Sequence, residues 1–120
     1  MKKICVIEDN AAIRKLFVTV LRKDGYELYD FASGISALNG LPTVMPELIV
    51  MDILLPDING TELIKKVRAI NGLANVPVIA VTGFATEQDS KKFLELGFNG
   101  YLAKPINTAD FTAEVKRLLG

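Results

Sequence analysis

The segment Leu48-Ile49-Val50-Met51-Asp52 decides the fold class of this chain. Its four apolar residues are typical of a strand that is buried on both faces of a parallel sheet. Asp52 follows them directly, at the carboxyl end of the expected strand, which is where ligands bind in open α/β sheets. A charge at the edge of a low-dielectric core can have its chemistry tuned by its surroundings. The segment therefore predicts a parallel α/β sheet and singles out Asp52 among the acids of the chain.

Strand and helix patterns alternate along the chain. Strands are predicted over residues 3–8, 27–31, 48–51, 76–82 and 101–103. Helices are predicted over residues 11–24, after a cap at Ser33, from Asn59 with Glu62 to near Asn71-Gly72, from Thr86 with Asp89 to Gly97, and from Asn107 with Asp110 to about Leu119. Pro42 and Pro46 predict a loop before the third strand. This alternation predicts one domain over residues 1–120, a three-layer doubly wound sandwich with helices on both faces of a parallel sheet.

Composition excludes several classes of function. The 14 basic and 14 acidic residues cancel, so no broad field favours direct binding to nucleic acid or to an anionic membrane. Apolar runs are far too short to cross a bilayer or to form a secretory signal. The single cysteine, Cys5, fits a reducing cytoplasm and a packing role. Histidine is absent, which excludes His-based acid–base catalysis and weakens most transition-metal interpretations.

Polar residues end four of the five predicted strands. The first strand brings Glu8 and Asp9 to the carboxyl edge of the sheet, the third brings Asp52, the fourth Thr82 and the fifth Lys104. Each residue alone has an ordinary explanation, such as a polar turn, a β-forming threonine or a solvated loop charge. Their shared position at one edge of the sheet favours a functional site.

The chemistry of these five residues indicates phosphoryl transfer. Three carboxylates packed together repel one another, and a cation keeps them ionised. Oxygen ligands without His or Cys favour Mg²⁺ or Mn²⁺. The Thr82 hydroxyl and the Lys104 ammonium suit phosphate oxygens. The set predicts an aspartyl nucleophile, Asp52, that takes up a phosphoryl group.

With these residues in place, the chain resembles the receiver domain of two-component response regulators over essentially its whole length. The resemblance rests on Glu8-Asp9, on Asp52 after its apolar strand, on Pro56 and Gly60 in the next loop, on Thr82, and on Lys104-Pro105. It implies a flavodoxin-like (βα)5 fold with a five-stranded parallel sheet of order 2-1-3-4-5.

The same resemblance implies a role for each site residue. Asp52 would be the phosphoacceptor, and Glu8, Asp9, Asp52 and the backbone carbonyl of Leu54 would hold the metal. Thr82 would move onto the phosphoryl oxygens, Lys104 would pair with them, and Tyr101 would swing inward as part of the switch. The Lys104–Pro105 bond would be cis.

Two features depart from the commonest family pattern. Glu8 stands where Asp is more frequent, which lengthens the ligand arm by one methylene. Two variable flanking positions, Leu54 and Phe84, are both apolar. We expect these side chains to hinder the hydrolytic water and to lengthen the life of the phosphorylated state.

The predicted function is a phosphorylation-controlled switch in the cytoplasm and not an enzyme, apart from its own phosphorylation and slow autodephosphorylation. A separate histidine kinase or phosphotransfer protein would supply the phosphoryl group, and the resemblance places its docking site near Asn10, Ala12, Ile13 and Leu16. For Ile13 and Leu16, core packing is at least as good an explanation, because both belong to the apolar stripe of the helix. The resemblance also implies that a downstream protein binds the surface of about Thr86 to Leu119.

Rival functions lack their required residues. The chain contains neither the P-loop pattern of a nucleotidase nor the Gly-x-Gly-x-x-Gly pattern of a dinucleotide binder. An aspartyl-phosphate phosphatase would normally carry a second Asp where Leu54 stands. The remaining alternative is a degenerate receiver that binds partners without being phosphorylated.

Overall fold

The computed structural model describes residues 1–83 and 87–120, and side-chain burial is described for all of these except Glu87 and Gln88. Within this part of the chain, strands and helices alternate from the first element to the last. The strands are β1 (Lys3–Ile7), β2 (Glu27–Phe31), β3 (Leu48–Asp52), β4 (Val78–Thr82) and β5 (Gly100–Ala103). The helices are α1 (Ala11–Lys23), α2 (Gly34–Val44), α3 (Gly60–Arg68), α4 (Glu87–Leu96) and α5 (Thr108–Leu119).

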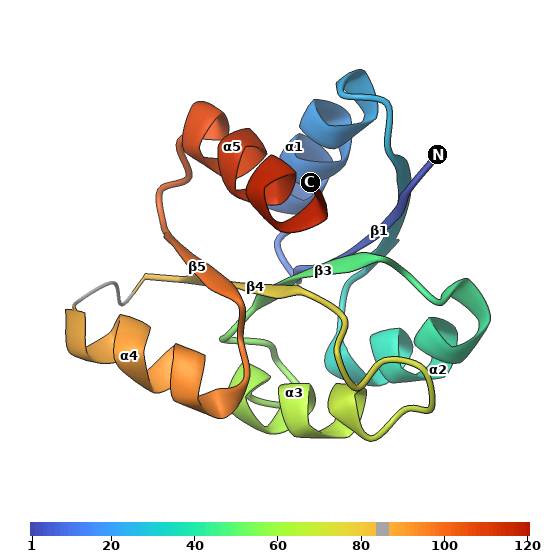
Figure 1. Ribbon diagram of the computed structural model, residues 1–120, viewed down its shortest axis with the longest axis vertical. Coiled ribbons are helices and arrows are strands. Elements are labelled where there is room, and N and C mark those ends of the chain that lie inside the picture. The colour runs from blue at the N-terminus through green and yellow to red at the C-terminus, as the bar shows by residue number, and fades with distance from the viewer. Residues whose placement is uncertain (84–86) are drawn as a thin grey trace.

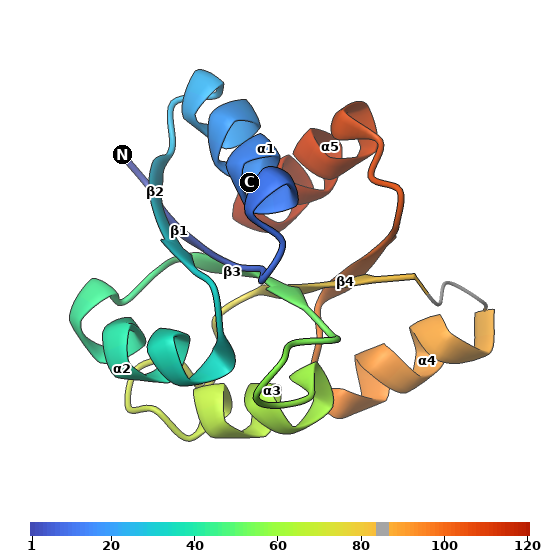
Figure 2. The same cartoon turned by 180° about the vertical axis from the view of Figure 1, so that it is seen from behind.

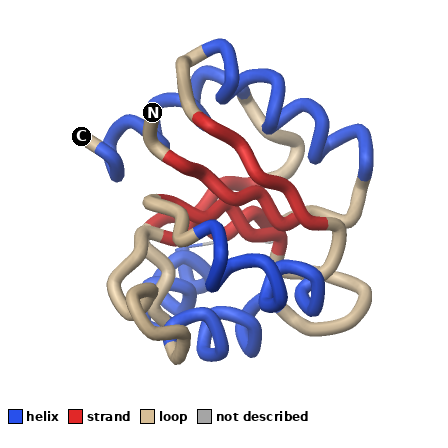
Figure 3. Tube along the Cα trace, turned by 90° about the vertical axis from the view of Figure 1, so that its right-hand side faces the viewer, coloured by secondary structure: helices blue, strands red, loops and turns tan. Residues whose placement is uncertain are grey.

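All neighbouring strands are parallel, in the order β2-β1-β3-β4-β5. This is the predicted flavodoxin-like topology. Helices α1 and α5 cover one face of the sheet, and α2, α3 and α4 cover the other (Figures 1 and 2). Figure 3 shows the strands between these two helical layers. None of the described helices is both long enough and apolar enough to cross a membrane.

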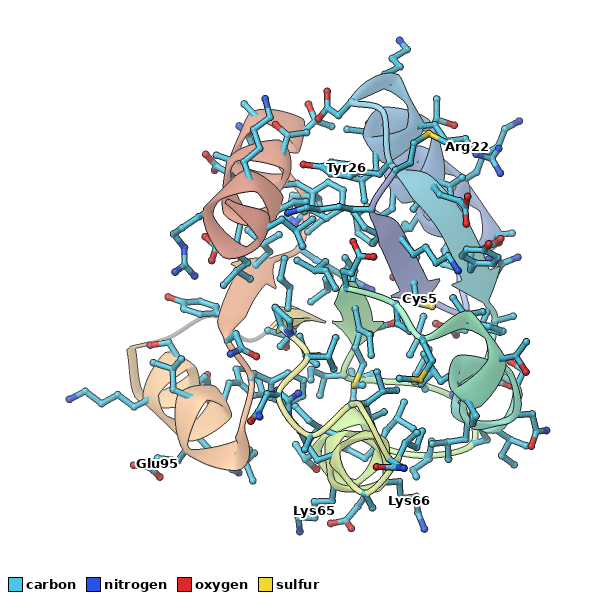
Figure 4. The ribbon with its side chains drawn as sticks, turned by 45° about the vertical axis from the view of Figure 1, so that its right-hand side comes forward. Cys5, Arg22, Tyr26, Lys65, Lys66 and Glu95 are labelled. Atoms are coloured by element: carbon cyan, nitrogen blue, oxygen red, sulfur yellow. The ribbon has the colours of Figure 1, made fainter. Side chains whose placement is uncertain are left out.

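Alternate residues of the central strands belong to two separate hydrophobic clusters, one on each face of the sheet. In β1, Ile4 and Val6 face α1 and α5, whereas Cys5 and Ile7 face the three other helices. Figure 4 shows Cys5 inside the molecule, while Lys65 and Lys66 extend from the outer side of α3. Burial on both faces explains why the central strands are apolar throughout, as expected for parallel sheets.

Helix starts are fixed by side chains that cap them. Asn10, Ser33, Asn59 and Asn107 each accept a hydrogen bond from a backbone N–H in the first turn of the following helix. Such caps satisfy amide groups that have no partner within the helix. Since each of these four helices begins after the carboxyl end of a strand, their caps also fix the loops at that edge.

The sequence prediction was wrong in one segment and inexact in others. Pro42 lies inside α2 rather than in a loop, and the helix continues to Val44, with Met45 as its left-handed cap at φ 50°. Burial of Ala37 and Leu41 against the sheet outweighs the missing proline donor. Helix α3 ends at Arg68, before Asn71-Gly72, and β4 starts after Pro77 instead of at Val76. The predicted helix start at Thr86 lies outside the described residues.

Candidate functional site

The carboxyl ends of four strands bring the predicted polar residues together. Glu8 directly follows β1, Asp52 and Thr82 end β3 and β4, and Lys104 directly follows β5. The strand register aligns these ends, because Asp52 is opposite Val81 and Thr82 is opposite Ala103. Glu8, Asp52 and Thr82 are the buried polar or charged residues among those described, which is unusual for carboxylates without a compensating charge.

Three carboxylates form a compact cluster. Glu8, Asp9 and Asp52 can each offer one oxygen so that all three atoms lie within 4.8 Å of one another. Asp9 is exposed, so the cluster opens to solvent on one side. Glu8 Oε2 accepts a hydrogen bond from Asn10 N at 3.1 Å, but the buried Oε1 atom has no hydrogen-bond partner within the described structure. An unbonded buried carboxylate oxygen is costly unless a cation faces it.

Lys104 supplies the positive charge at this site. Its Nζ atom lies 3.1 Å from Glu8 Oε1 and 3.3 Å from Asp52 Oδ2, and the first contact is an ion pair without hydrogen-bond geometry. Burial lowers the pKa of Lys104, but its ion pairs with Glu8 and Asp52 outweigh this and raise it, so the ammonium stays charged. The backbone N–H of Lys104 donates to Thr82 O at 2.8 Å, which fixes the end of β5 on β4. The Lys104–Pro105 peptide bond is cis.

Burial is the main influence on the ionisation of Glu8. Burial and the neighbouring Asp52 carboxyl raise the pKa of Glu8 to about 7, although the Asn10 amide and Lys104 act in the opposite direction. With all groups ionised, three carboxylates and one ammonium give a net charge of −2. A divalent cation with a preference for oxygen would balance this charge. The donor set therefore fits Mg²⁺ or Mn²⁺, with Glu8, Asp9 and Asp52 as the residues that could hold it.

The loop after β3 is tightly folded against the end of its own strand. Leu54 N donates to Asp52 Oδ1 at 3.3 Å, Gly60 N donates to Ile53 O at 2.7 Å, and Leu54 pairs with Asn59 in an antiparallel bridge. A Cβ atom at Gly60 would lie 2.8 Å from Ile53 Cα, so only glycine allows this approach. The Leu54 side chain is 59% exposed at the rim of the site.

Two other predicted residues differ in their surroundings. Thr82 is buried, whereas Tyr101 is half-buried in β5 and packs against the hydrophobic cluster on the α2–α4 face. Phe84, the second apolar flanking position, lies outside the described residues. The metal role of the Leu54 carbonyl and the motions of Thr82 and Tyr101 stay predictions.

Sequence reasoning missed two residues that support the site. Arg14 donates to Glu8 O at 2.8 Å and pairs with Asp30 at 3.1 Å, which ties α1 to the loop after β1. Asp57, in the loop after β3, accepts hydrogen bonds from Gly34 N and Ile35 N at the start of α2. No local pattern in the sequence pointed to Asp57, because its two partners lie 23 and 22 positions away. No pattern in the sequence pointed to Arg14.

Fold and site together define a doubly wound protein with an acidic, lysine-flanked cluster at the carboxyl ends of its strands. The sequence matches the family described as response regulator receiver domain over residues 4–116. The chain therefore belongs to this family of two-component signalling proteins, as the sequence indicated.

Named relatives agree with this assignment. The chain is similar to the polar-differentiation response regulator DivK of Brucella ovis, with 37% identity over 119 residues that cover 99% of this chain and 97% of the relative. Its structure is similar to that of the chemotaxis response regulator CheY4 of Vibrio cholerae, with a TM-score of 0.93, 25% identity and 98% of each chain covered. It is also similar to the receiver domain of the sensor histidine kinase PA1611 of Pseudomonas aeruginosa, with a TM-score of 0.88, 32% identity, and 99% of this chain and 98% of that chain covered. That protein has a magnesium ion coordinated in its active-site cleft.

Proposed function

We propose that the chain is a phosphorylation-dependent switch that accepts a phosphoryl group on Asp52. The observation that carries the proposal is the position of the Asp52 carboxylate, which is buried next to Lys104 and to the carboxylates of Glu8 and Asp9. A buried carboxylate so close to other acids is poorly explained by stability alone, since replacing such charges by apolar groups often stabilises a protein.

The proposed reaction is transfer from a phosphohistidine to Asp52. An oxygen of the Asp52 carboxylate attacks the phosphorus atom, an O–P bond forms, and the N–P bond breaks. The electron pair stays on the imidazole nitrogen of the donor, which then takes a proton from water. The Lys104 ammonium, already 3.3 Å from Asp52, would form an ion pair with the phosphoryl oxygens. When bound by Glu8, Asp9, Asp52 and the Leu54 carbonyl, a divalent cation would offset the charge of the phosphoryl group.

The phosphoryl donor would be a histidine kinase or phosphotransfer protein, because the chain has no histidine. A cavity of about 240 Å³ beside the site supports docking there, and it is lined by Ile13, Leu16, Lys104, Pro105 and Ile106. Ile13 is half-buried against the core, but Leu16 is 42% exposed on α1. The exposure of Leu16 favours a contact role over core packing for that residue.

The response to phosphorylation would reach the surface formed by α4, β5 and α5. Thr82 would follow the new phosphoryl oxygens, and Tyr101, half-buried in β5, would turn inward. A downstream protein would bind this surface, whose described part begins at Glu87 and ends at Leu119. Apart from its own phosphorylation and slow dephosphorylation, the chain would catalyse no reaction. A cytoplasmic location is part of this proposal, since the sole cysteine, Cys5, is buried and unpaired.

Intact-mass measurement after incubation with Mg²⁺ and acetyl phosphate tests the proposal. We expect the added mass of one phosphoryl group on the wild-type chain and none on Asp52→Asn. Asp24→Asn, which alters an acid at the end of α1 far along the chain from the site, is the matched control and should be phosphorylated like the wild type. An unmodified wild-type chain would favour the phosphorylation-independent receiver, and a modified Asp52→Asn would place the phosphoryl group elsewhere.

A further inference from the structure

A contact outside the acidic cluster fixes the loop that follows the phosphoacceptor strand. The side chain of Asp57, at the tip of this loop, accepts two hydrogen bonds from the start of α2. Gly34 N donates to Oδ1 at 3.0 Å and Ile35 N donates to Oδ2 at 2.8 Å. Both carboxylate oxygens are thus used, across 22 and 23 positions of sequence. In Figure 2 the loop between β3 and α3 lies beside the beginning of α2.

Packing reinforces the same contact. A Cβ atom at Gly34 would lie 2.1 Å from Ile58 Cγ2, so the absence of a side chain at Gly34 lets the loop touch the helix directly. Helix α2 has no acid of its own in the first turn, and Asp57 supplies the negative charge that a helix N-terminus favours. The hydrogen bonds from Ile35 and Gly34 lower the pKa of Asp57, so the carboxylate stays ionised at neutral pH.

The remaining bonds of the loop lie at its base, near Ile53, Leu54 and Gly60. Asp57 therefore joins the loop tip to a second element of the fold. We propose that Asp57 is a positioning residue that holds the loop of residues 53–59 against α2, so that the Leu54 backbone is preorganised for cation binding at Asp52. This inference rests on the proposed function, because it assigns Asp57 a part in the same site without contact to the metal or the phosphoryl group.

Calorimetric titration with Mg²⁺ at physiological ionic strength tests this role. Asp57→Ala is expected to weaken Mg²⁺ binding by about fivefold, somewhat less than the loss typical for a direct partner of a metal ligand. Asp57→Asn keeps one acceptor oxygen, and its Mg²⁺ affinity should lie between those of Asp57→Ala and the wild type.

A double variant separates positioning from helix stability and from net charge. Ile35 is 60% exposed, so Ile35→Glu can place an acid in the first turn of α2 without steric conflict. In the Asp57→Ala background this change restores the charge and the stability of the helix start, but not the bond to the loop. We expect the melting temperature to recover and the Mg²⁺ affinity to stay low. Amide exchange at Gly60, measured without metal, should be faster in both Asp57→Ala chains than in the wild type.

Two results would overturn the inference. One is an Asp57→Ala chain that binds Mg²⁺ within about twofold of the wild type, well inside the loss expected for a supporting residue. The other is recovery of affinity together with the melting temperature in the double variant. A different result would refute the proposed function, because the wild-type chain itself would then neither bind Mg²⁺ nor take up a phosphoryl group.

Discussion

Replacing Glu8 by glutamine isolates the effect of its charge on the metal-free protein. The Glu8 side chain is fully buried, and burial and the Asp52 carboxyl raise its pKa from 4.5 to about 7. The folded protein therefore binds more protons than the unfolded chain between about pH 4.5 and 7. Wild-type stability falls as pH rises through this window, and a neutral glutamine removes that dependence.

The size of the effect follows from the pKa difference. Each unit of pKa corresponds to about 1.4 kcal/mol of free energy. The rise in the Glu8 pKa from 4.5 to about 7 therefore means that ionised Glu8 destabilises the fold by about 3 kcal/mol at most. Solvent on the exposed Asp9 side of the cluster screens part of this, which leaves about 2 kcal/mol above pH 7. Glu8→Gln should then melt about 8 °C above the wild type at pH 8, and the difference should shrink towards zero near pH 4.

Thermal melts monitored by circular dichroism from about pH 4 to 8, with chelator present, measure this difference. Glu8→Asp, which keeps the charge, is the control and should retain the pH dependence of the wild type. Mg²⁺ at about a hundredfold above its dissociation constant should add about 2.7 kcal/mol to the wild type and far less to Glu8→Gln, which reverses their order. Identical pH dependence of wild type and Glu8→Gln would refute the argument that Glu8 is held at an unfavourable charge.

Three further substitutions test the loop and the core. Gly60→Ala places a Cβ atom 2.8 Å from Ile53 Cα, and we expect a loss of about 1–3 kcal/mol in urea unfolding together with weaker Mg²⁺ binding in calorimetry. Phe111→Ala removes a fully buried ring whose centroid lies 4.7 Å from that of Phe17, and should cost about 3–5 kcal/mol in the same unfolding assay without changing Mg²⁺ affinity of the folded chain. Leu54→Asn replaces an exposed apolar side chain at the rim of the site, and should speed loss of the phosphoryl group severalfold by mass spectrometry; an unchanged rate would remove Leu54 as a barrier to water.

Much of the candidate site was accessible from the sequence because strand ends are periodic features of a parallel sheet. Once the apolar runs were assigned to strands, Glu8, Asp52, Thr82 and Lys104 had to meet at one edge. The caps Ser33, Asn59 and Asn107 were also identified correctly, since a cap acts on residues only two or three positions away.

Other features depend on groups that are distant in sequence. The local propensity of Pro42 predicts a loop, but burial of Leu41 against the sheet keeps Pro42 within α2. The bonds from Asp57 to α2 and from Arg14 to the loop after β1 join segments with no shared periodicity. No local pattern specifies such partners.

The sequence by itself determined the strands of the sheet and the residues at their carboxyl ends, because hydrophobic patterning and chain order dictate both. The resemblance to a known family added the order of the strands. Only the tertiary structure decided how the charges interact. Glu8 is buried beside Asp52 with its Oε1 atom lacking a hydrogen bond in the described structure, and Lys104 lies between the two carboxylates. Solvent exclusion and distances of a few ångströms set the pKa of Glu8, and both arise only when separate strands pack together.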